Sequence, residues 1–73
     1  MKKEDFIPGE QYIMMEAGGS PHIEEGSIVT FLRDQYMGMG VFSCDQYKEL
    51  DINYSRLAPY TPEHNVQLHP LIT

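Results

Sequence analysis

Turn-forming residues interrupt this chain so often that only short regular elements fit between them. Glycine and proline cluster at 8–9, 17–21 and 38–40, and polar turn residues stand at 34–35 and 45–46. Glycine adopts backbone angles that other residues avoid, and proline lacks a hydrogen-bond donor, so both tend to end strands and helices. Between the turns, β-branched and aromatic residues alternate with other side chains, a pattern that favours strands. The sequence therefore predicts a mostly-β domain.

Five short strands are expected, at 10–16, 27–33, 39–44, 47–52 and 57–60. Tyr12 and Met14 share one face of the first strand, and Leu50 and Ile52 share the inward face of the fourth. Residues 53–56 are too few for an α-helix and fit one 3₁₀ turn before the last strand. We expect residues 1–5 and 61–73 to be flexible ends, which leaves one domain at 6–60.

Five strands with one 3₁₀ turn before the last are the layout of a small SH3-like barrel. The runs FIPGEQY at 6–12, GGSPHIEEGSIVT at 18–30 and NYSRLAP at 53–59 resemble a widespread class of small phage-encoded SH3-like proteins. The resemblance covers residues 6–60 and implies the fold. Within that class, the length and acidity of the chain are also similar to those of phage regulators that bind host RNA polymerase, block promoter use and suppress termination.

The charge and the single cysteine indicate the surroundings in which the chain works. Eleven acids against five lysines and arginines give a net charge of −6, which repels nucleic acid and favours basic protein surfaces. Cys44 is alone and cannot form an intramolecular disulfide, which is typical of a reducing compartment. No apolar run is long enough to cross a membrane, and the N-terminus lacks the apolar stretch of a signal peptide. We expect a monomer in the cytoplasm of the host cell, with no nucleic-acid or membrane partner.

Patterns that would carry catalysis or hold a cofactor are weak in this sequence. The histidines at 22, 64 and 69 and Cys44 lack the paired spacing of a zinc site. The glycines at 18–19 and 38–40 are not followed by the lysine and the helix of a phosphate-binding loop. We therefore expect no catalytic residues, no metal and no cofactor, and interpret the protein as a binding module and not an enzyme.

Two kinds of side chain are candidates for contact with a partner protein. Exposed acids would steer a basic partner, and aromatic or methionine side chains would anchor it. The candidates are Glu24, Glu25, Asp34, Tyr36, Met37, Asp45, Tyr47, Glu49, Asp51 and Tyr54.

The main hypothesis is a non-catalytic phage host-takeover protein that binds bacterial RNA polymerase and inhibits initiation, suppresses termination, or both. One alternative is an acidic DNA mimic that inhibits a DNA-binding host protein. Another is a phage structural or assembly module that pairs through a strand edge. The apolar residues of the tail, at 66, 68, 71 and 72, also allow it to order on a partner as an extended peptide.

Overall fold

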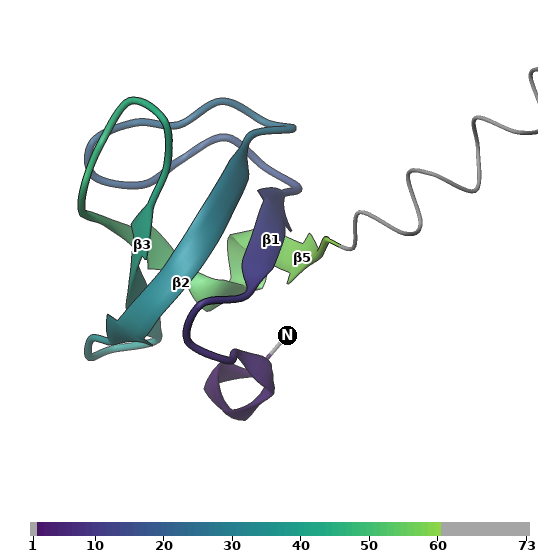
Figure 1. Ribbon diagram of the computed structural model, residues 1–73, viewed down its shortest axis with the longest axis vertical. Coiled ribbons are helices and arrows are strands. Elements are labelled where there is room, and N and C mark those ends of the chain that lie inside the picture. The colour runs from purple at the N-terminus through teal and green to yellow at the C-terminus, as the bar shows by residue number, and fades with distance from the viewer. Residues whose placement is uncertain (1, 61–73) are drawn as a thin grey trace, which may run out of the picture.

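The computed structural model describes residues 2–60 of the chain. The elements along these residues, shown in Figure 1, are η1 (Lys3–Asp5), β1 (Gln11–Met14), β2 (Ile28–Asp34), β3 (Met39–Ser43), β4 (Leu50–Asn53), η2 (Tyr54–Arg56) and β5 (Leu57–Pro59), where η marks a 3₁₀ turn. The predicted mostly-β fold with five strands is confirmed. The tail expected at 61–73 lies outside the described residues.

All five strands belong to one antiparallel sheet, in the order β4-β3-β2-β1-β5. The η2 turn carries the chain from β4 at one edge to β5 at the other edge. The antiparallel order places the β1–β2 loop (15–27) and the β3–β4 loop (44–49) at one end of the sheet, here called the loop end. The β2–β3 turn (35–38) lies at the opposite end, here called the hairpin end (Figure 1).

The core follows the alternation that the sequence predicts. Tyr12 and Met14 are buried on β1, and Leu50 and Ile52 are buried on β4. On β2 the buried residues are Val29 and Phe31, at the same spacing of two. Successive side chains of a strand point to opposite faces, so this spacing gathers one apolar face for each strand.

The N-terminal residues take a larger part in the fold than the sequence indicates. Residues 3–5 form a 3₁₀ turn, so the structure has two such turns where one was expected. Phe6 follows directly and is buried, with its ring centroid 4.4 Å from that of Tyr12 and 4.6 Å from that of Tyr54. Phe31 and Phe42 complete this aromatic cluster. Burial of the Phe6 ring therefore ties the start of the chain to the core.

Four of the five strands are shorter than predicted, and the two with the largest differences, β1 and β4, are limited by local hydrogen bonds. The Gly26 amide donates to the Met14 carbonyl at 2.7 Å, and β1 ends at this point. The Cys44 amide donates to the Tyr47 carbonyl at 2.9 Å, which makes 44–47 a turn and delays the start of β4 to Leu50. Cys44, predicted as a strand residue, thus lies just beyond β3, half-buried against the core.

The edges of the sheet are partly occupied. The pairing of described residues is open, because β4 and β5 do not pair with each other. At the β4 edge, Ser20 from the β1–β2 loop and Asp51 exchange backbone hydrogen bonds of 3.0 and 3.1 Å. At the β5 edge, the Leu57 amide donates back to the Tyr54 carbonyl, and Pro59 has no amide proton.

Residues 2–60 contain no helix with the length and hydropathy to span a membrane.

Candidate protein-binding surfaces

Three of the six predicted contact acids lie close to cations of the same chain. Arg33 donates two hydrogen bonds to the Glu49 carboxylate, at 3.1 and 3.3 Å. These bonds and the charge attraction lower the pKa of Glu49 and raise the pKa of Arg33, and the charge of Asp51 adds to the effect on Arg33. Asp34 lies 3.8 Å from the Lys3 ammonium. These acids offer a partner less free charge than the sequence suggests.

Asp34 also binds the one predicted contact residue whose ring is buried. The Tyr54 side chain packs in the aromatic cluster and only 4 % of the residue is exposed. Its hydroxyl donates to the Asp34 carboxylate at 2.6 Å. Burial, and then this hydrogen bond, raise the pKa of Tyr54 well above its ordinary value. Tyr54 is thus a core residue that fixes the end of β2, and its ring is not available to a partner.

The remaining acids, Glu24, Glu25 and Asp45, gather at the loop end. No lysine or arginine among residues 2–60 forms an ion pair with any of them. Glu24 lies 3.9 Å from His22, a contact that attracts only when the imidazole is protonated. Lys48 follows Asp45 by three positions in the same loop, and Arg33, the lysine or arginine nearest in sequence to Glu24 and Glu25, binds Glu49 instead. The loop end therefore carries those predicted contact acids that have no lysine or arginine partner among residues 2–60.

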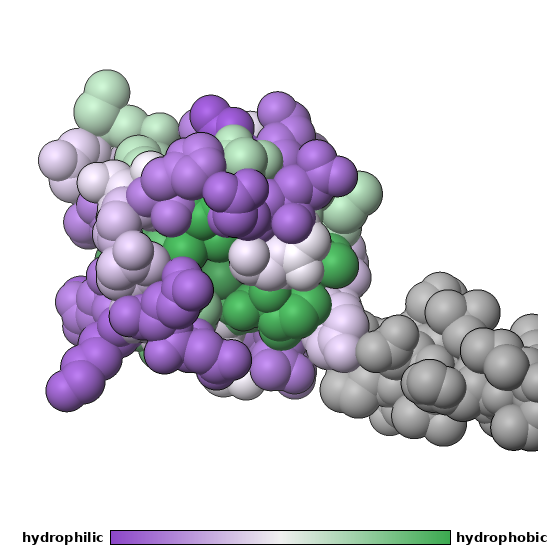
Figure 2. All heavy atoms as spheres, turned by 90° about the horizontal axis from the view of Figure 1, so that it is seen from above, coloured by the Kyte–Doolittle hydropathy of each residue, from purple (hydrophilic) through white to green (hydrophobic). Residues whose placement is uncertain are grey.

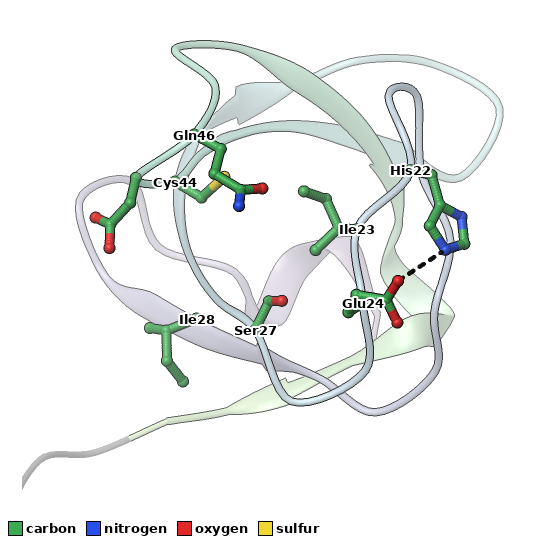
Figure 3. A pocket seen from close by; sticks show the side chains of 8 residues that line it. His22, Ile23, Glu24, Ser27, Ile28, Cys44 and Gln46 are labelled. Carbon is green, nitrogen blue, oxygen red and sulfur yellow. Dashed lines mark ion pairs between the residues drawn. The ribbon is translucent and has the colours of Figure 1, made fainter.

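A hollow of about 500 Å³ opens between the two loops at this end, here called the acidic hollow. It is lined by His22, Ile23, Glu24, Ser27, Ile28, Cys44, Asp45 and Gln46. Figure 2 looks onto this end and shows an apolar area framed by hydrophilic side chains. In Figure 3, Ile23, Cys44 and Gln46 lie around the opening, and Glu24 stands at its side with His22 beyond it.

The acidic hollow continues toward the end of the described chain. A second hollow of about 430 Å³ shares Ile28, Cys44 and Asp45 with the first and reaches Tyr60. Gln11, Thr30 and Ser43 also line this second hollow, so the aliphatic and sulfur atoms common to the two hollows come from Ile28 and Cys44. The acids were expected from the sequence, but the shared lining by Ile28 and Cys44 was not, because these residues are sixteen positions apart and reach one hollow through the pairing of β2 with β3.

The exposed anchors predicted from the sequence do not form one surface. Tyr36 and Met37 are exposed at the hairpin end, whereas Tyr47 is more than a third exposed in the β3–β4 loop at the loop end. The exposed aromatic and methionine anchors therefore lie at opposite ends of the molecule.

Metal ligands were not expected, and residues 2–60 contain no group of three His, Cys, Asp or Glu side chains placed to hold an ion. The histidines at 64 and 69 lie outside the described residues.

Comparison of the chain with protein-family models, with curated proteins and with solved structures finds no match. The arrangement of the described residues is therefore what bears on function.

Proposed function

We propose that this protein is a non-catalytic binding module whose acidic hollow receives a basic segment of a partner protein. The supporting observation is that two carboxylates without lysine or arginine partners, Glu24 and Asp45, line the same hollow as the apolar side chains of Ile23 and Ile28. A lysine or arginine side chain has a charged head and an aliphatic stem, so it matches both parts of this surface. Electrostatic attraction between such surfaces raises the rate of association and favours the correct partner.

For the partner we propose bacterial RNA polymerase, with inhibition of initiation, suppression of termination, or both as the outcome. The resemblance of residues 6–60 to small phage SH3-like proteins supports this choice, as do the small size and the charge of −6. The same resemblance, with the strand order β4-β3-β2-β1-β5 and the η2 turn before β5, supports an SH3-like barrel as the fold. A cytoplasmic monomer agrees with this role.

The two alternative hypotheses have less support from the arrangement of the chain. A DNA mimic needs rows of free carboxylates, but Arg33 and Lys3 interrupt the acids at Glu49 and Asp34. An assembly module needs a free strand edge, but Ser20 occupies the backbone of Asp51 on β4.

The proposal is tested by titrating the purified protein into bacterial RNA polymerase and measuring affinity and association rate at two salt concentrations. The double variant E24Q/D45N removes both carboxylates of the acidic hollow, and the control variant E4Q/E10Q removes the same charge away from the loop end. We expect E24Q/D45N to weaken binding about 10–100-fold, mainly through slower association at low salt, and the control to bind like the wild type. The wild type should also change promoter-dependent transcription in vitro.

Two results would contradict the proposal. Absence of polymerase binding by the wild type would remove the polymerase as partner. Equal loss of affinity in the two double variants would show that the overall charge, and not the acidic hollow, governs binding.

A further inference from the structure

The β2–β3 turn has a residue at its tip that its backbone disfavours. The Met39 amide donates to the Tyr36 carbonyl at 3.3 Å, so Met37 and Gly38 are the two central residues of a tight turn. Their φ angles are +59° and +78°, which is the pattern of a type I′ turn. Such turns favour asparagine or glycine at the first central position, because other side chains clash with their own backbone there. Gly38 fits this geometry, and Met37 does not.

Packing of the Met37 side chain does not offset the free-energy cost of its left-handed backbone conformation. Met37 is 85 % exposed and its neighbour Tyr36 is 68 % exposed, the two highest values among the large hydrophobic residues that are exposed. Both belong to the β2–β3 turn at the hairpin end (Figure 1). A strained conformation that the fold itself does not use is a reason to look for a function at that position.

We propose that Tyr36 and Met37 form an anchor that inserts into an apolar pocket on the partner protein. This inference rests on the proposed function for the identity of the partner, and it adds a second contact at the end opposite the acidic hollow. Tyrosine provides a rigid contact area, and methionine adapts its unbranched chain to the shape of a pocket. The type I′ turn holds both side chains at the tip, where a pocket can surround them.

The charge of the chain favours a protein pocket with basic residues around it over other apolar surfaces. A net charge of −6 repels a second copy of the same chain and repels anionic lipid. It attracts a basic protein surface, which is also what the acidic hollow requires. One partner that is basic around both contacts would therefore satisfy the two ends of the molecule.

The test uses M37N, which places a residue favoured by the turn at the tip and removes the methionine side chain. We expect its thermal midpoint to rise by about 4–8 °C because the left-handed conformation no longer carries the same penalty. We expect its affinity for bacterial RNA polymerase to fall at least about tenfold because the anchor is lost. The control M15N replaces a methionine that is 56 % exposed at the loop end without a positive φ, and it should neither raise the midpoint nor weaken binding.

The outcomes separate this proposal from the proposed function. If the wild type and M37N bind the polymerase equally well, the anchor is refuted and the proposed function stands. If M37N is no more stable than the wild type, the premise of a strained tip is refuted. If the wild type does not bind the polymerase, the proposed function fails and the assignment of this partner to the tip fails with it. Self-association, or binding to phosphatidylglycerol vesicles, that M37N abolishes would assign the tip to another surface and overturn the proposal.

Discussion

Substitution of Gly40 by alanine should destabilise the fold through a direct clash with two core rings. Gly40 is buried on β3, and its φ lies outside the left-handed region, so the backbone itself accepts alanine. An added Cβ would lie 2.7 Å from Cε1 and 2.8 Å from the hydroxyl oxygen of Tyr54, and 2.9 Å from Cε1 of Phe31. Comfortable contacts between such atoms are about 3.5–4.0 Å, so the rings must move by roughly 1 Å.

The position of the Tyr54 ring sets the size of the effect. Overfilling a packed core costs about 1–3 kcal/mol. A shift of the ring also strains the hydrogen bond from Tyr54 to Asp34, a bond to a charged group that contributes about 1.5–3 kcal/mol when intact. Alanine makes the unfolded chain less flexible than glycine does, which offsets about 0.4–1 kcal/mol of the loss in stability. We expect G40A to lower the free energy of unfolding by about 2–4 kcal/mol and the thermal midpoint by roughly 10–25 °C.

Urea unfolding followed by circular dichroism measures this change, with G9A as the control. Gly9 has φ +89° and no atom within 4 Å of an added Cβ, so G9A reports only the backbone penalty, about 1–2 kcal/mol. In a Y54F background the contact to the hydroxyl is absent, so the loss caused by G40A should be smaller by at least about 0.5 kcal/mol. A loss below about 0.5 kcal/mol for G40A, or equal losses with and without the Tyr54 hydroxyl, would refute the steric argument.

Two further predictions concern the same aromatic cluster. The pKa of Tyr54 is raised in the folded state, so above about pH 10 the unfolded chain releases a proton that the folded chain keeps. The free energy of unfolding therefore falls with rising pH, by up to about 1.4 kcal/mol per pH unit from this group. Y54F should lower stability at neutral pH but give a shallower decline between pH 10 and 11.5 in urea titrations, and parallel curves would contradict this reasoning. F6A should cost about 3–5 kcal/mol because it empties a buried ring position, and thermal melts should show it as one of the most damaging single changes. A melt close to that of the wild type would mean that the N-terminal residues contribute little to the core.

The sequence predicted the features that depend on alternation along one strand. Leu50 and Ile52 were assigned to a buried face correctly, and Tyr12 and Met14 were placed correctly on one shared face, because a strand side chain has only two directions. The length of each strand was less well predicted. The ends of β1 and β4 depend on hydrogen bonds between residues several positions apart, which no propensity indicates.

The candidate site could be predicted only in part, because pairing across the sheet decides which charges remain free. Arg33 and Glu49 are sixteen positions apart in the sequence, and they meet because β3 pairs with both β2 and β4. The same folding buries the Tyr54 ring and separates Tyr36 from Tyr47. Composition predicts that the surface is acidic, but it does not predict where the charges lie. The positions of the acidic hollow and of the exposed Tyr36 and Met37 follow from the tertiary structure.

The treatment of the two sheet edges has a practical consequence for handling the protein. A growing fibril recruits strands by matching rows of backbone donors and acceptors, and here Ser20 occupies Asp51 while Leu57 and Pro59 present no outward amide. Concentrated samples should therefore stay clear for long measurements such as nuclear magnetic resonance. A replacement of Pro59 by valine would restore one donor to the β5 edge, and slow gelation of that variant is the behaviour to watch for.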